Sequence, residues 1–128
     1  MCWSIGAELP LPQNAQEDTD LYNYLNSINL VSGWLDGTDE IEEGVWLDSA
    51  GNNITFFNWR SDQPDNNNGR EHYIMYRPGW DGLWNDHTGT HTDAVVCQKP
   101  AESVGELFSI VRRRFGYLSH LNFALRIL

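Results

Sequence analysis

The sequence has few basic residues, few cysteines and no long apolar run. Its 128 residues include 8 Lys and Arg against 18 Asp and Glu, which gives a formal net charge of −10. Nucleic-acid binding depends on clustered basic side chains that neutralise phosphates, so this balance argues against a nucleic-acid partner. No stretch approaches the roughly 20 apolar residues of a membrane-spanning helix, so no membrane span is expected. The N-terminal segment also lacks the basic start and apolar run of a signal peptide.

Cysteine is scarce, with one residue near each end of residues 1–100. Cys2 and Cys97 could be free thiols or one bridge, and composition alone leaves both states open. A bridge would constrain the unfolded chain by about 4–5 kcal/mol in the chain-entropy account. No serine or cysteine lies in a recognisable nucleophile motif, so we expect no enzymatic activity.

The apolar content is high for so acidic a chain. Hydrophobic residues make up 41% of the sequence and include six tryptophans, which predicts a packed core and one domain. The charge is uneven, because residues 1–100 hold most of the acids and residues 101–128 hold four arginines against two acids. We therefore place a boundary near Pro100, between a domain over residues 1–100 and an extension over residues 101–128.

Helical and strand patterns follow one another in the first 100 residues. Residues 14–28 predict a helix, with Asn14 as its N-cap and Leu21, Tyr24 and Leu25 on one face. Four short runs rich in aromatic and β-branched residues, separated by Gly, Asn and Asp, predict strands over residues 45–47, 54–59, 73–76 and 94–97.

The extension leaves two interpretations open. Residues 107–128 could form a helix that contacts a membrane surface or a partner, with residues 112–114 as its polar stripe. Its apolar residues scatter around more than one helical face, however, which favours a poorly ordered extension.

Oxygen-bearing side chains gather in two places. Residues 61–70 contain no hydrophobic side chain, so they form a surface loop or a site. Two clusters, one in and just after this loop and one after Trp84, offer three carboxylates and two amides: Gln63, Asp65, Glu71, Asn85 and Asp86. Ca²⁺ takes six to eight oxygen ligands, so the set nearly fills one site. The alternative is that these residues only form turns and caps.

Five segments taken together resemble C-type lectin-like domains. The resemblance covers residues 2–99 and depends on their succession: GAELPLPQNAQED, WLDGTDEIEEGVW, FFNWRSDQPDNNNGRE, LWNDH and AVVCQKP. It implies an α+β C-type lectin-like fold with two helices, small antiparallel sheets and a long Ca²⁺-binding loop region. It also implies that the first strand and the start of the first helix are missing from this chain.

The resemblance implies Ca²⁺-dependent carbohydrate binding, with glycans or glycoproteins as partners. Matched position by position, the Ca²⁺ and sugar site falls on Gln63, Asp65, Glu71, Asn85 and Asp86, the last adding its backbone carbonyl. Pro64 looks like the family's cis-proline, which turns its two neighbours toward one ion. The ion leaves room for two vicinal sugar hydroxyls, which the same amides and carboxylates also hydrogen-bond.

The order of Gln63 and Asp65 resembles the galactose type, as opposed to Glu followed by Asn for mannose. The usual stacking aromatic two residues after the Asp is Asn67 here, and Trp80 is either a substitute platform or a core or rim residue. Two alternative functions stay open: a domain of the same fold that binds a protein without sugar, and a truncated form without activity.

A second Ca²⁺ site of the family is half present. Two of its ligand positions hold Asp39 and Glu43, and the other two hold Asn66 and His72. An Asn carbonyl can coordinate Ca²⁺, but imidazole is a poor ligand for a hard cation, so we expect little occupancy.

The resemblance also pairs Cys2 with Cys97, which predicts a disulfide and an extracellular location, secreted or in an ectodomain. The family's inner cysteine pair falls on Tyr73 and Gly89, so both of its halves are absent. Asn53 lies in an Asn-Ile-Thr triplet and is a candidate glycosylation acceptor.

Overall fold

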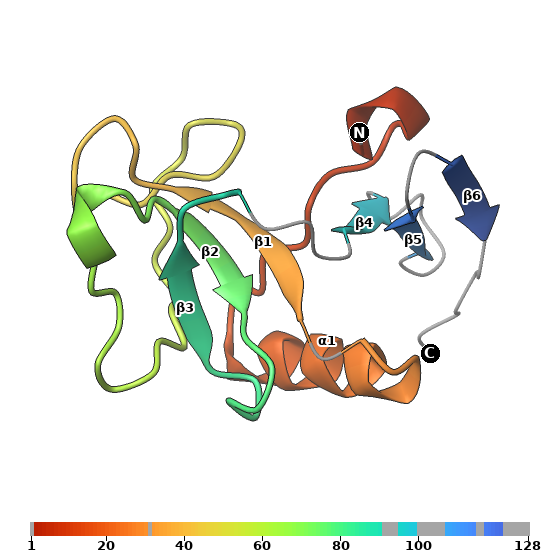
Figure 1. The fold of residues 1–128 in the computed structure, drawn as a ribbon, viewed down its shortest axis with the longest axis horizontal. Helices are drawn as coiled ribbons and strands as arrows, with labels where there is room; N and C mark the ends of the chain where they lie inside the picture. The colour runs from red at the N-terminus through yellow and green to blue at the C-terminus, as the bar shows by residue number, and fades with distance from the viewer. Residues whose placement is uncertain (1, 31, 91–94, 100–106, 115–116, 122–128) are drawn as a thin grey trace.

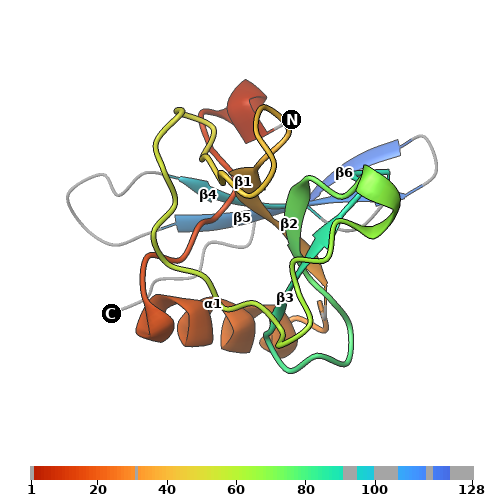
Figure 2. The same ribbon diagram turned by 90° about the vertical axis from the view of Figure 1, so that its left-hand side faces the viewer.

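The chain has an α+β architecture, with one α-helix and two small antiparallel sheets in the part that the structure describes. The structure is a computed structural model and describes residues 2–30, 32–90, 95–99, 107–114 and 117–121. The helix α1 (Ala15–Ser27) lies beneath the sheets in both views (Figures 1 and 2). No helix among the described residues is long and apolar enough to cross a membrane.

The helix α1 forms where its capping residues predict it. The Asn14 side chain accepts hydrogen bonds from the backbone N–H groups of Gln16 and Glu17, at 3.1 and 3.0 Å. These bonds satisfy two of the amide donors that a helix leaves without partners at its start. The prediction for residues 14–28 is therefore confirmed. Of the two helices that the resemblance implied, the first is represented in the described residues only by the 3₁₀ turn η1 (Cys2–Ile5).

The first sheet contains three strands with β2 in the middle: β1 (Gly33–Thr38), β2 (Tyr73–Tyr76) and β3 (Trp84–His87). The strand predicted over residues 73–76 is confirmed as β2. Its register pairs Ile74 with Asp86 and Met75 with Asn85. Two predicted ligands thus lie on the edge strand β3, opposite buried residues of β2.

The strands predicted over residues 45–47 and 54–59 are wrong. These segments make only isolated bridges, such as Leu47 with Asn53 and Trp59 with Trp84. Val45 is exposed, but most of the other large apolar side chains of these segments pack into or against the core from an irregular backbone: Trp46, Ile54, Phe56, Phe57 and Trp59. The composition that suggested strands therefore reflects burial, because β-propensity largely measures side-chain packing.

The second sheet is built by the end of the chain. It has the order β4 (Val95–Lys99), β5 (Leu107–Arg114) and β6 (Tyr117–Leu121), all antiparallel. The strand predicted over residues 94–97 corresponds to β4, with residue 94 outside the described residues. In Figure 1 the hairpin β5–β6 lies at the opposite end of the molecule from the loops that follow β1.

The helix considered for residues 107–128 is wrong for residues 107–114 and 117–121, which are strands, and residues 122–128 lie outside the described part. Backbone pairing with β4 outweighs a helical pattern whose apolar residues lack a single face. Since β5 joins the sheet of residues 95–99, the division at residue 100 stays a prediction.

The N-terminal segment is attached to β4 by a covalent and a backbone link. Cys2 and Cys97 form a disulfide across 95 residues of sequence, as predicted. Glu8 and Gln98 exchange two backbone hydrogen bonds, of 2.9 and 2.7 Å. Strand β4 is therefore paired with β5 on one edge and bridged to Glu8.

A buried carboxylate joins α1 to the first sheet and to the segment before the predicted site. Asp18 is only 4% exposed. The hydroxyl of Tyr76 and the indole N–H of Trp84 both donate to its Oδ1, at 2.6 and 2.8 Å, and the Asn58 amide donates to its Oδ2 at 2.7 Å. Burial, together with the adjacent Asp18, raises the pKa of Tyr76, which keeps the phenol protonated as a donor.

Replacing Asp18 tests how much this network holds the fold. Asp18→Ala removes the side-chain acceptor of two buried donors, Tyr76 and Trp84, and one of the two acceptors of the half-buried Asn58 amide, at about 1–3 kcal/mol for each buried donor. We therefore expect the free energy of unfolding to fall by about 3–5 kcal/mol in a denaturant titration. Asp20→Ala, which removes an exposed carboxylate from the same helix, should change it by less than about 1 kcal/mol. Equal losses in the two variants would contradict this role of Asp18.

Candidate functional site

Three predicted ligands converge where the 61–71 segment, here called the site loop, meets β3. Carboxylate oxygens of Asp65, Glu71 and Asp86 lie within 4.8 Å of one another. Asp86 is fully buried, Glu71 is partly buried and Asp65 is exposed. We call these three residues, with Gln63 and Asn85, the primary cluster.

Backbone amides of the site loop hold this arrangement in place. The Asp65 N–H donates to Asp86 Oδ1 at 3.1 Å, and the Asn66 N–H donates to Asp86 Oδ2 at 2.7 Å. The loop turns sharply at Asn66, whose φ of 40° lies in the left-handed region that asparagine tolerates better than most residues. Both oxygens of a buried carboxylate on a strand thus fix the turn that carries Asp65.

The two amide side chains of the primary cluster differ in their bonding. The Gln63–Pro64 peptide bond is cis, as the resemblance implied. Gln63 Oε1 is shielded from solvent and has no hydrogen-bond partner among the described residues. The buried Asn85 amide donates to the backbone carbonyl of Asp86. A buried carbonyl oxygen without a donor is costly, so Gln63 Oε1 is well suited to a cation that coordinates it.

The carboxylates of the primary cluster repel one another. Burial raises the pKa of Glu71, the Asn67 amide partly opposes this change, and the nearby Asp86 and Asp65 add to the rise. Bringing like charges together in this way disfavours ionisation unless a cation joins them. Three carboxylates and two amides that present oxygen suit a hard divalent ion such as Ca²⁺.

Other residues singled out in the sequence take structural roles. The guanidinium carbons of Arg60 and Arg77 lie 4.3 and 5.1 Å from the Trp80 ring centroid, so this tryptophan is engaged by two arginines. Asn67 is exposed at the start of the 3₁₀ turn η2 (Asn67–Gly69). Asn53 is exposed, as glycosylation requires, and its modification stays a prediction.

The positions of the absent inner cysteine pair are in contact. A side chain placed on Gly89 would lie 2.7 Å from the Tyr73 ring, so the ring packs directly over this glycine. The Tyr73 hydroxyl also donates to Glu40 at 2.9 Å. Aromatic packing therefore joins the two segments at the place where the family has a disulfide.

The second cluster contains a pairing that sequence reasoning missed. His72 Nδ1 lies 2.9 Å from Asp39 Oδ1, and the Asn66 side-chain amide donates to Glu43. Asp39, Glu43, Asn66 and His72 thus do come together, but through direct bonds between side chains. The residue types alone carried no signal for these bonds. The contact of His72 with Asp39 depends on how the end of β1 meets the residue before β2, and the bond to Glu43 depends on the turn at Asn66.

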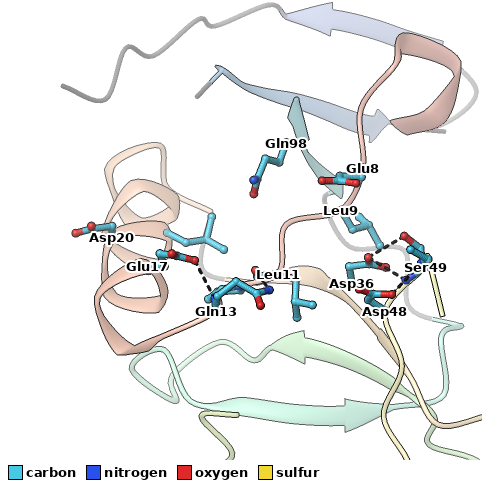
Figure 3. Close-up of a pocket in the computed structure, with 13 residues that line it drawn as sticks. Glu8, Leu9, Leu11, Gln13, Glu17, Asp20, Asp36, Asp48, Ser49 and Gln98 are labelled. Carbon is cyan, nitrogen blue, oxygen red and sulfur yellow. Dashed lines mark hydrogen bonds between the residues drawn. The ribbon is translucent and has the colours of Figure 1, made fainter. Parts of the chain in front are cut away.

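The pocket in Figure 3 is a separate feature of about 380 Å³ between α1, the N-terminal segment and the turn after Asp48. Residues of the primary cluster do not line it. Its carboxylates serve the fold: Glu17 accepts from the Gln13 N–H, and Asp36 accepts from the N–H and the hydroxyl of Ser49. We therefore place the candidate site at the primary cluster.

Comparison with known proteins identifies the fold. No family model matches the chain. Pulmonary surfactant-associated protein D of Bos taurus is 28% identical over 98 residues, which are 77% of this chain and 26% of that protein. The chain therefore spans about a quarter of the length of this curated relative.

Comparison with solved structures leads to the same kind of domain. The C-type lectin CEL-I from Cucumaria echinata is 27% identical with a TM-score of 0.60, covering 69% of this chain and 66% of that chain. The mouse scavenger receptor C-type lectin carbohydrate-recognition domain is 25% identical with a TM-score of 0.69, covering 80% and 77%. Herring type II antifreeze protein is 29% identical with a TM-score of 0.68, covering 79% and 78%. The chain therefore has a C-type lectin-like fold.

Neutralising Glu71 should stabilise the metal-free protein. Its pKa is raised in the folded state, so the stability it contributes is present below its unfolded pKa and is lost as pH rises through the folded pKa. At pH 7 the ionised side chain therefore destabilises the fold. We expect Glu71→Gln to unfold at a higher temperature than the unmodified protein in a chelator at pH 7. The control Glu42→Gln, an exposed carboxylate outside both clusters, should leave the transition unchanged. A lower transition temperature for Glu71→Gln would contradict the claim that ionised Glu71 destabilises the metal-free fold.

Proposed function

We propose that this chain is a Ca²⁺-dependent carbohydrate-binding module. The observation that carries the proposal is the convergence of Asp65, Glu71 and Asp86. It is supported by the shielded oxygen of Gln63, two residues before Asp65, which has no hydrogen-bond partner among the described residues. One divalent cation there would offset the burial and the neighbouring carboxylates that together raise the pKa of Glu71, and would satisfy the Gln63 carbonyl. Ca²⁺ is the ion expected, because every ligand atom proposed in the set is oxygen.

The same residues would recognise a sugar. Five side chains do not complete the six to eight ligands of Ca²⁺, so positions remain for two vicinal hydroxyls of a sugar ring. Each hydroxyl would donate to a carboxylate such as Asp65 or Glu71 and accept from an amide such as that of Gln63. Hydrogen bonds to charged groups contribute about 1.5–3 kcal/mol each when they are shielded from water. Sugar binding should therefore require the metal.

The proposed sugar class is galactose-type. Gln63 and Asp65 flank the cis-proline with the amide first and the carboxylate second, which fixes where a hydroxyl meets a donor and where it meets an acceptor. The stacking surface differs from the family pattern, since Asn67 replaces the aromatic residue and Trp80 is covered by arginines. We therefore expect weaker binding than an aromatic platform would give, because stacking adds apolar contact.

Relatives and the disulfide support an extracellular role as a binding protein. Two of the similar structures are a C-type lectin and a C-type lectin carbohydrate-recognition domain, so the proposed role is binding without catalysis. A disulfide between Cys2 and Cys97 suits an oxidising compartment. Glycans or glycoproteins are accordingly the proposed partners. The similarity to an antifreeze protein keeps a ligand other than sugar as the second candidate.

Affinity chromatography tests the proposal. Immobilised galactose should retain the full chain in Ca²⁺ and release it when a chelator is added, and mannose should retain it less. Asp65→Ala should abolish retention, since it removes an exposed ligand while leaving the loop amide that Asp86 binds. The matched variant Asp62→Ala, which removes an exposed carboxylate three residues earlier, should be retained like the unmodified protein.

Retention that persists in the chelator would contradict the proposal. So would equal behaviour of the Asp65 and Asp62 variants. If neither sugar retains a chain that unfolds cooperatively and is stabilised by Ca²⁺, the second candidate, a ligand other than these sugars, would be favoured.

A further inference from the structure

A second group of metal-ligating atoms lies beside the primary cluster and has a different chemistry. Donor atoms of Asp39, Glu43 and His72 lie within 4.8 Å of one another. His72 Nδ1 is 2.9 Å from Asp39 Oδ1 and 3.8 Å from Glu43 Oε2. The Asp39 side chain is 1% exposed, whereas those of His72 and Glu43 are 25% and 56% exposed. The group is thus anchored in the interior and open on one side.

The backbone already holds these three residues together. The Asp39 N–H donates to the His72 carbonyl at 3.3 Å, which joins the end of β1 to the residue before β2. His72 in turn donates its N–H to the His87 carbonyl at 3.1 Å. The Gly44 N–H donates to Asp39 Oδ2 at 2.9 Å, which closes the turn that carries Glu43. A site formed from such fixed residues loses little entropy when it binds an ion.

The group has an excess of negative charge. It contains two carboxylates, and His72 is their only ion-pair partner among the described residues. A buried carboxylate such as Asp39 is costly without a compensating charge. A divalent cation would supply that charge and would replace contact between side chains by coordination.

The donors do not fit Ca²⁺, although the resemblance has its second Ca²⁺ position here. Asn66 is the residue that would have to add an oxygen, but its Oδ1 accepts from the Glu71 N–H at 3.1 Å and its amide nitrogen faces Glu43. Two carboxylates and an imidazole nitrogen are then left. That number falls short of the six to eight oxygen ligands of Ca²⁺, and nitrogen suits softer ions.

The donors do fit an ion of the zinc type. Zinc uses carboxylate oxygens and imidazole nitrogens at about 2.0–2.1 Å in a tetrahedron, so its ligand atoms lie about 3.4 Å apart. The two distances measured from His72 Nδ1, 2.9 and 3.8 Å, lie on either side of that separation. We propose that Asp39, Glu43 and His72 bind Zn²⁺, with water as the fourth ligand, in place of a second Ca²⁺.

Calorimetric titration of the full, metal-free chain with Zn²⁺ tests this proposal. We expect one Zn²⁺ per chain, with affinity reduced at least tenfold by His72→Ala and also by Glu43→Gln, a milder change at an exposed side chain. His87→Ala, the matched control, removes a histidine from β3 and should retain the affinity. Asp65→Ala should also retain it, which separates this site from the proposed sugar site.

Three outcomes would overturn the proposal. Unchanged Zn²⁺ affinity in both the His72 and the Glu43 variants would place zinc elsewhere, and an equal loss in His87→Ala would indicate an adventitious ion only. Displacement of Zn²⁺ by an equimolar amount of Ca²⁺ would show that the position is a Ca²⁺ site. Thermal unfolding of each variant in a chelator checks that it is folded before it is titrated.

Discussion

The carboxylate of Asp18 is the contact on which the arrangement of the other elements depends. It accepts hydrogen bonds from Tyr76 on β2, from Trp84 on β3 and from Asn58 before the site loop. One side chain of α1 therefore fixes two strands and a loop segment that are far apart in sequence. Trp84 is fully buried and contacts Phe56, Trp59 and Tyr76 edge to face. The hydrogen bond from Trp84 to Asp18 therefore also orients the aromatic core. Such geometry is favourable for aromatic rings and specific in direction.

The elements that Asp18 joins lead directly into the site. Asn85 and Asp86 follow Trp84 on β3, and the Arg60 N–H donates to the Trp84 carbonyl at 3.1 Å. The loop is then held near its middle, where Asp86 accepts hydrogen bonds from the backbone N–H groups of Asp65 and Asn66. Asn66 also bonds Glu43 and Glu71, so it connects the primary cluster to the second one. Proposed ligands of two different ions thus share one turn.

The sequence predicted some features of the fold from neighbouring residues and others only through the family resemblance. Asn14 predicts the start of α1 through its side-chain cap, whereas the resemblance implied the cis bond before Pro64 and the pairing of Cys2 with Cys97. Elements that depend on distant partners were not predictable in the same way. The segment Ile54–Trp59 has the composition of a strand but lacks a continuous neighbour, and β5 forms because β4 offers a free edge to pair with.

The two clusters likewise differ in how much of each could be predicted from the sequence. The resemblance supplied the residues of the primary cluster, and the structure brings the carboxylates of Asp65, Glu71 and Asp86 together. It could not supply the contact of His72 with Asp39, because that contact depends on how one substituted side chain fits among its neighbours. Likewise, the absent inner cysteines gave no indication that Tyr73 would pack over Gly89. Substitutions at family positions create new contacts that only coordinates reveal.

A crystal structure of the chain grown in Ca²⁺ is the most direct test of the central claim, that the primary cluster is a calcium site. The account predicts one ion about 2.3–2.6 Å from the side-chain oxygens of Gln63, Asp65, Glu71, Asn85 and Asp86. An ion bound at another position, or a primary cluster without an ion at saturating Ca²⁺, would contradict it.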